Sequence, residues 1–220
     1  MERYFDEQLK ELHKDLLKMG ALAQEAIFKS VEALKNRDKE QALEVIGSDT
    51  KLDNLELIID EKCIDLIACH QPMAGDLRFI TTGMKINAEL ERIADLAVDI
   101  SQRVLELAGK PLLKPLIDIP KLSAIAQKMV GDSLESFIKK DVSLARKVVL
   151  ADTEADKLRN LVSAELVDDY MARDVKTADR AVSLLLIARH LERICDHATN
   201  IAEDVIYMVE GKVIKHHHEE

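Results

Sequence analysis

The chain has 220 residues, of which 47% are apolar, 3% aromatic and 33% charged, and its formal net charge is −10 at pH 7. An acidic chain without clustered Lys and Arg argues against a nucleic-acid-binding surface, which must neutralise phosphates. The longest uninterrupted apolar run, residues 184–188, is far shorter than the roughly 20 residues of a membrane-spanning helix. Any membrane contact is therefore expected to be peripheral or through a partner.

Cysteine usage and the N-terminal sequence indicate a cytoplasmic protein. The three cysteines, Cys63, Cys69 and Cys195, form no CxxC pair and are predicted to be small buried apolar residues in a reducing compartment. The segment Met1–Tyr4 has acidic residues close behind it and does not resemble a signal peptide.

Abundant Ala, Leu, Ile, Glu and Lys, with few aromatic residues, predict an all-α fold of long helices. In residues 3–35, apolar side chains recur at steps of three and four, which gives one apolar stripe. Asp38, Asp76 and Asp141 are suited to cap the helices that follow them. Further helices are predicted over residues 38–69, 76–108, 120–139, 141–172 and 174–211.

A proline-rich segment divides the chain near its middle. Three of the four prolines lie within residues 111–120, so we place a boundary there. The predicted units are residues 1–110, residues 118–212 and a flexible His-rich tail, 213–220. Short connections make neighbouring helices antiparallel, so each of the two units is expected to contain three long antiparallel helices, six in all.

The two halves repeat each other. Residues 38–55 align with residues 141–158 at a constant offset of 103, and Leu90–Ile93 recurs as Leu191–Ile194. Aliphatic matches between amphipathic helices can arise by chance, but the same acids in the same order indicate an internal duplication.

The duplication preserves carboxylates spaced four residues apart, which lie one above the other on a single helix face. Like charges in this arrangement repel, so they need a compensating cation or a structural reason. Asp99 extends one pair by a turn, and Asn200 is its counterpart. The pairs are Asp49/Asp53, Glu91/Asp95, Asp152/Asp156 and Glu192/Asp196.

Spacing places these pairs level with each other across a helix hairpin. Asp53 precedes the turn at residues 71–75 by nearly as many residues as Asp95 follows it, and the second half repeats this relation. Several carboxylates together suit hard cations such as Mg²⁺, Mn²⁺ or iron. The alternative is a solvated acidic stripe with Arg92 and Arg193 as counter-ions. Recurrence in both halves favours a metal.

The other candidate residues indicate no catalytic centre. No histidine follows a Glu by three residues, as a buried di-iron bundle requires, and no Gly-rich phosphate loop or nucleophile elbow is present. His190 is expected to be a packing residue and His197 a helix-surface residue. His216–His218 could bind a metal from the tail.

The chain resembles the PhoU family of phosphate-specific transport system accessory proteins over essentially its whole length. The resemblance is carried by Asp76–Phe79 after a proline-containing turn, by Leu90–Asp95, and most specifically by Ala188–Glu203. Ala94 and Cys195 stand where the family usually has glycine, a change between small residues.

This resemblance implies a fold of two pseudo-symmetric three-helix bundles and an often homodimeric protein that represses the phosphate regulon when phosphate is plentiful. Together with the lack of a catalytic constellation, it predicts a non-enzymatic regulator. Its implied partners are the ATPase subunit of the phosphate ABC transporter and a sensor histidine kinase, with membrane contact only through them. It also implies metal ions, including multinuclear clusters, bound by the four E(D)xxxD pairs; Asp99 and Asn200 make the two patches unequal. The sequence does not distinguish Mg, Mn, Fe and Zn.

Two other functions fit the same residues. One is a metal-storing or metal-dependent hydrolytic protein that uses the carboxylates directly. The other is a structural helical adaptor whose acids are solvated.

Overall fold

The structure is a computed structural model that describes residues 2–211, with side chains from residue 4 onward. Within those residues it contains no strand, so the all-α prediction is confirmed. The predicted tail, residues 213–220, and Lys212 at the end of the second predicted unit lie outside the described residues. The helices are α1 (Glu2–Asn36), α2 (Lys39–His70), α3 (Ala74–Ala108), α4 (Asp118–Lys139), α5 (Val142–Glu165) and α6 (Ala178–Glu210).

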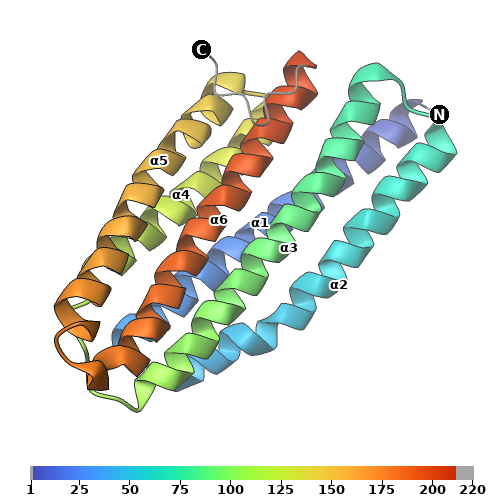
Figure 1. The fold of residues 1–220 in the computed structure, drawn as a ribbon. Coiled ribbons are helices and arrows are strands. Elements are labelled where there is room, and N and C mark those ends of the chain that lie inside the picture. Colours follow the sequence, from blue (N-terminus) through green and yellow to red (C-terminus); the bar gives the residue numbers. More distant parts are fainter. Residues whose placement is uncertain (1, 212–220) are drawn as a thin grey trace.

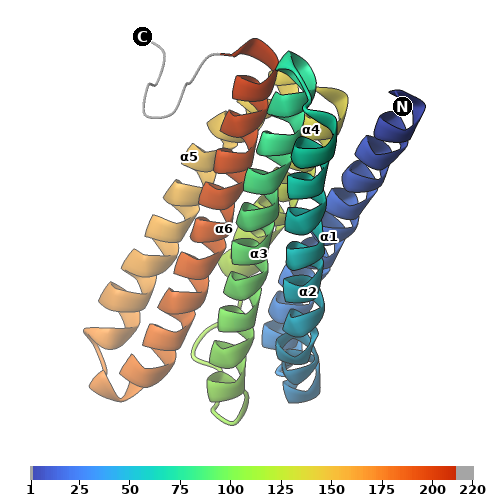
Figure 2. The ribbon, with the colours of Figure 1, turned by 90° about the vertical axis from the view of Figure 1, so that its right-hand side faces the viewer.

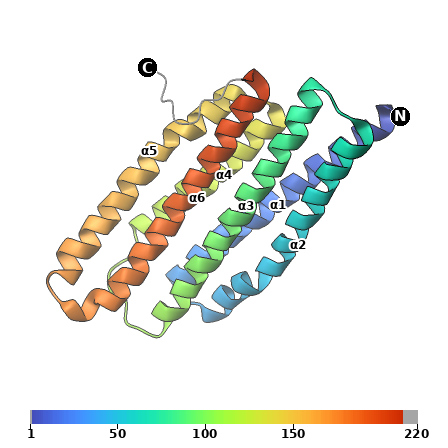
Figure 3. The ribbon, with the colours of Figure 1, turned by 45° about the vertical axis from the view of Figure 1, so that its right-hand side comes forward.

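The six helices form two layers. Helices α5, α6, α3 and α2 run side by side in that order, and α4 and α1 lie behind them (Figures 1 and 3). Helices α1–α3 pack as one three-helix bundle and α4–α6 as the other, and the bundles meet through α3 against α6 and α1 against α4. Helices α2 and α5 therefore occupy the two outer edges. Figure 2 shows the same arrangement from the side of α2.

One aliphatic core runs through both bundles. Ile27, Ile93 and Ile194 are fully buried within it, and Phe137 is one of its few aromatic members. Complete burial of such a side chain contributes about 1.5–3 kcal/mol. Within residues 2–211, no helix has the length and apolar composition needed to cross a membrane.

Helices α1 and α4 approach closely where the two halves meet. A Cβ atom at Gly20 would collide with the Leu134 side chain, so glycine permits this contact. The Gln24 Nε2 donates to the carbonyl of Gln127 at 3.1 Å. Gln24 and Gln127 are separated by the repeat offset of 103, so this contact joins equivalent positions of the two halves.

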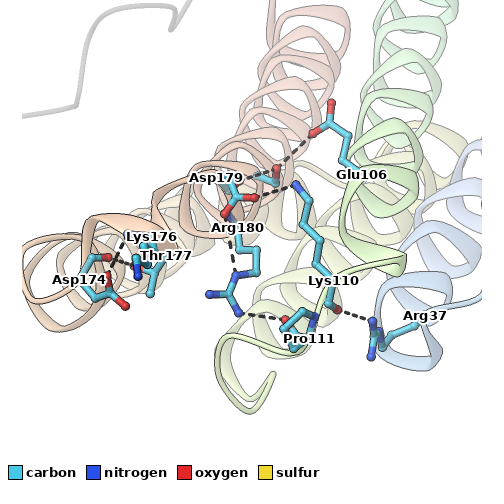
Figure 4. Close-up of polar contacts among 10 residues, drawn as sticks. Arg37, Glu106, Lys110, Pro111, Asp174, Lys176, Thr177, Asp179 and Arg180 are labelled. Carbon is cyan, nitrogen blue, oxygen red and sulfur yellow. Dashed lines mark hydrogen bonds and ion pairs between the residues drawn. The ribbon is translucent and has the colours of Figure 1, made fainter.

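Polar contacts hold the linker between the bundles, residues 109–117, in place (Figure 4). The Arg37 guanidinium, which follows α1, donates to the carbonyls of Ala108 and Lys110, the former at 2.8 Å. The Lys110 ammonium pairs with Asp179 of α6 at 3.0 Å, and Arg180 donates to the Pro111 carbonyl at 3.2 Å. The linker is therefore tied to both bundles.

Two of the three predicted helix caps are confirmed. Asp38 accepts a hydrogen bond from the Gln41 amide and Asp141 from the Leu144 amide, both at 3.0 Å. The prediction for Asp76 was wrong, because α3 begins earlier and Met73 precedes it without a side-chain cap. Asp76 lies in the first turn, where a negative charge is favoured by the helix dipole.

Two helix ends also differ from the predictions. Helix α4 begins at Asp118, which places Pro120 in the first turn, where a missing N–H breaks no intrahelical bond. Helix α5 ends at Glu165 and continues as a π-helical turn, η1 (Leu166–Met171), before the short 3₁₀ turn η2 (Val175–Thr177).

Candidate functional site

Five carboxylates from α2 and α3 form what we call the first acidic patch. They influence one another electrostatically across the two helices: Asp53 of α2 raises the pKa of Asp95 on α3, and Asp95 raises that of Asp49. The two predicted pairs are thus brought together as the hairpin spacing indicated. The patch consists of Asp49, Asp53, Glu56, Glu91 and Asp95.

Burial and mutual repulsion make ionisation of this patch costly. Burial, followed by the charges of Asp95, Glu56 and Asp53, raises the pKa of Glu91 to about 7. Burial is also the first cause of the raised pKa values of Asp49, Glu56 and Asp95. A neighbouring cation would relieve both effects by favouring the charged forms.

The first acidic patch has no counter-ion of its own. Within the described residues, none of its five carboxylates makes an ion pair with Lys, Arg or His. Arg92, the counter-ion of the alternative interpretation, is mostly exposed and lies 3.9 Å from Glu89; its charge lowers the pKa of Glu91 less than burial and the neighbouring acids raise it. The Asp49 Oδ1 is buried and has no hydrogen-bond partner. An unpaired buried acceptor of this kind costs free energy unless a ligand satisfies it.

Asn87 of α3 fixes α2 beside the patch. Its fully buried side chain donates from Nδ2 to the Glu56 carbonyl and to Asp60 Oδ1, each at 2.9 Å. These bonds hold the two helices in register and so position the acidic rows opposite each other.

Asp99 stands at the edge of the patch. Its charge contributes to the raised pKa of Asp95, and its Oδ2 lies 3.8 Å from His190 Nδ1 on α6. His190 packs between helices as expected, although its buried Nδ1 has no hydrogen-bond partner. Asp99 therefore lies between the patch and the other bundle.

The second acidic patch, Asp152, Asp156, Glu192 and Asp196, repeats this grouping on α5 and α6. Burial and then the charges of Glu192, Asp152 and Asp156 raise the pKa of Asp196 to about 6. Burial and Asp156 likewise raise the pKa of Asp152. The predicted residues of the second half are thus also close to one another, apart from Asn200.

An arginine distinguishes the second patch from the first. Arg159 of α5 donates to Glu192 at 2.8 Å and lies 3.9 Å from Asp156. The repeat offset pairs Arg159 with Glu56, so one bundle has an internal cation where the other has a further acid. Neither residue was predicted from the sequence, because the prediction rested on positions that are the same in both repeats. The signal was present: Glu56 lies seven residues after Asp49, on the same helix face.

Asn200 and His197 take part in a polar contact between the bundles. The Asn200 Nδ2 donates to Glu89 Oε2 at 3.2 Å, and His197 Nδ1 lies 2.6 Å from the same oxygen. Burial acts to raise the Glu89 pKa, but these two partners, together with the charge of Arg92, outweigh it and leave the pKa below its ordinary value. The prediction of a surface position for His197 was wrong, because the residue is buried against α3.

The cysteines follow the prediction in part. Cys63 and Cys195 are buried, and burial raises the pKa of each thiol. Cys69 is exposed, since it lies on the outer face of α2, so its predicted burial was wrong.

The chemistry of the first acidic patch fits a hard cation better than that of the second. It offers oxygen donors, uncompensated charge and the unpaired Asp49 Oδ1, whereas Arg159 already neutralises Glu192. Among the described residues, no three Asp, Glu, His or Cys side chains are arranged as ligands of one ion in this conformation. Binding would therefore require exposed carboxylates such as Asp53 and Asp95 to reorient.

The family model described as "PhoU domain" matches the chain twice, over residues 16–104 and 119–205. The chain belongs to the PhoU family. The two PhoU domain matches fall one in each helical bundle, in agreement with the duplication.

Relatives and solved structures of the PhoU family match the chain over most of its length. The phosphate-specific transport system accessory protein PhoU homolog of Aquifex aeolicus is 44% identical over 211 residues, covering 96% of this chain and 95% of the relative. Homolog 2 of Thermotoga maritima is 35% identical and covers 100% and 93%. The crystal structure of PhoU from Pseudomonas aeruginosa superposes with a TM-score of 0.90 at 34% identity, covering 94% of this chain and 100% of that one.

Proposed function

We propose that this chain is a non-enzymatic accessory protein of phosphate transport that acts as a negative regulator of the phosphate regulon. The observation that carries the proposal is its family membership over both halves, together with relatives named phosphate-specific transport system accessory proteins. A Streptococcus pneumoniae relative of known crystal structure, 28% identical with a TM-score of 0.89, is a phosphate transport system regulatory protein.

In this proposal the protein acts in the cytoplasm, between the ATPase subunit of the phosphate ABC transporter and a sensor histidine kinase. Membrane contact is made only through these partners. The test is a strain that lacks the gene and carries a reporter of phosphate starvation. We expect the reporter to be active in high phosphate and to be silenced by the full chain. Normal repression in the deletion strain would contradict the proposal.

We further propose that divalent or trivalent metal ions bind the first acidic patch with higher affinity than the second. Asp49, Asp53, Glu91 and Asp95 would hold the ion, with Glu56 beside them, and the ion would supply a positive charge in direct contact with the patch. Two observations support this order of affinity. The Asp49 Oδ1 has no hydrogen-bond partner, and among the described residues no carboxylate of the first patch makes an ion pair.

Elemental analysis after dialysis against Mg, Mn, Fe or Zn tests the metal proposal. The matched variants are Asp53→Asn with Asp95→Asn in the first patch and Asp156→Asn with Asp196→Asn in the second. We expect the first pair of substitutions to remove more metal than the second. Equal metal content in all three proteins would exclude the assignment. Turnover of a phosphate ester by the metal-loaded protein would favour the hydrolytic alternative.

A homodimer is also proposed, on the basis of the family. Leu57, Ile58 and Ile64 on the outer face of α2 are more than half exposed, at 64%, 51% and 56%, and support association through that edge. Light scattering of the full chain and of a Leu57→Glu, Ile64→Glu variant tests it. A monomeric wild-type chain would contradict the proposal.

A further inference from the structure

Three arginines line one groove on the surface of the second bundle. Arg159 of α5 and Arg189 and Arg193 of α6 border a cavity of about 570 Å³ between these helices. Ser163 contributes a hydroxyl, and Leu185 and Leu186 form an apolar part of the wall.

The equivalent positions in the first bundle have the opposite character. The repeat offsets pair Arg159 with Glu56, Ser163 with Asp60 and Arg189 with Ala88. Two acids and an alanine are thus replaced by two arginines and a serine, on the same faces of the same kind of helix hairpin. Of the three arginines, only Arg193 has a basic counterpart, Arg92.

The three arginine side chains have hydrogen-bond donors that lack an acceptor. Within the described residues, the exposed side chains of Arg189 and Arg193 make no hydrogen bond or ion pair. Arg159 uses its two terminal nitrogens on Asn160 and Glu192, while its Nε is buried and has no acceptor. Buried N–H groups without an acceptor are rare and costly, so this groove is short of an acceptor.

The carboxylates of the groove do not cancel this surplus. Glu192 is neutralised by Arg159 at 2.8 Å. Asp196 is the other acid of the groove, so its lining contains three arginines and two acids. The side chains that line the groove therefore carry a net positive charge, although the chain as a whole is acidic and Asp152 and Asp156 act on Asp196 from beside the groove.

We propose that the groove between α5 and α6 binds the phosphate group of a small anion, held by Arg189 and Arg193 with Ser163 as a further donor. Guanidinium groups match tetrahedral oxyanions with paired N–H donors, which makes arginine suited to this class of ligand. The volume and the apolar wall admit a phosphate monoester as well as orthophosphate. This proposal does not depend on metal binding by the acidic patches or on the regulatory role.

Calorimetric titration of the full chain, treated with chelator and held at constant ionic strength, tests the proposal. The probes are orthophosphate and AMP, with chloride as the control anion. We expect saturable binding of at least one phosphate probe and none of chloride. The Arg189→Gln, Arg193→Gln double variant should bind roughly tenfold more weakly or worse, as expected for lost charge-assisted hydrogen bonds.

Arg92→Gln is the matched control, because it removes the same charge from the equivalent position of the first bundle. It should leave affinity unchanged. Circular dichroism melts check that the variants fold, and the two single variants replace the double variant if it does not. Unchanged affinity in the arginine variants, equal loss in Arg92→Gln, or no saturable binding of either phosphate probe would overturn the proposal. Binding of one probe alone would support it and identify the source as free phosphate or a monoester.

Discussion

Arg159 and Glu56 occupy equivalent positions of the two bundles and have opposite effects on the carboxylates around them. Arg159 pairs with Glu192 at 2.8 Å, whereas Glu56 adds to the repulsion that raises the pKa of Glu91. The two halves thus share a backbone arrangement and differ in electrostatics.

Substitution of Glu56 by Arg should give the first bundle the counter-ion of the second. We expect Glu56→Arg to weaken metal binding at the first acidic patch by roughly tenfold or more, because an acid beside the ion is replaced by a positive charge. Titration with Mn²⁺ or Mg²⁺ measures the effect. Glu61→Arg, an identical charge change on the exposed face of α2, is the control. Similar losses in the two variants would show that only net charge matters.

Stability should depend on pH through Glu91. Its pKa rises from an ordinary 4.5 to about 7 in the folded chain, so between these pH values the folded state binds more protons than the unfolded state. The free energy of unfolding should therefore fall as pH rises from about 4.5 to 7.

Urea unfolding at a series of pH values, in the presence of chelator, measures this dependence. Glu91→Gln should remove its share of the slope in that window, to which Asp196, with a pKa raised to about 6, also contributes, and Glu61→Gln should leave the slope unchanged. Added metal should reverse the decline, because a cation favours the ionised carboxylates. A pH dependence of Glu91→Gln identical to that of the wild-type chain would contradict the assignment.

Removal of the Glu89 carboxylate should destabilise the contact between the bundles. Glu89→Ala leaves His197, which is buried, and Asn200, which is half-buried, without their shared acceptor. We expect the free energy of unfolding to fall by about 1–3 kcal/mol. Glu135→Ala, which removes an exposed pair with Lys139, should cost less than about 1 kcal/mol. Equal effects in chemical denaturation would argue against a structural role for this contact.

Loss of Arg37 should loosen the linker without unfolding the bundles. Arg37→Ala removes the donors to the carbonyls of Ala108 and Lys110. We expect faster chymotryptic cleavage at Leu112, Leu113 or Leu116, with little change in the thermal midpoint. Lys121→Ala, which removes an exposed pair with Asp118, is the control. Unchanged cleavage of Arg37→Ala would show that the linker is held by its apolar contacts.

Sequence patterns predicted the helices and the grouping of Asp53 with Asp95, because helical periodicity and distance from a short turn fix both. The contact of Glu89 with His197 and Asn200 was not predicted, since it joins residues more than 100 positions apart whose approach depends on how the bundles pack. The π-helical turn after Glu165 was missed because it keeps the apolar spacing of a helix end.

The cap assigned to Asp76 failed for a local reason. Acidic residues are favourable both before a helix and within its first turn, so composition alone does not decide the boundary. Arg159 could have been recognised by asking where the repeats differ, because a mismatch at a shared position marks chemistry that the two halves do not have in common.

The difference between Arg159 and Glu56 also makes the surfaces of the two bundles inequivalent. If the two bundles were identical, the molecule would look the same after a rotation of 180°. A partner protein could then bind in two equivalent orientations. Here a charged partner that spans both bundles meets an acidic end and an arginine-bearing end. Only one of the two poses then pairs opposite charges.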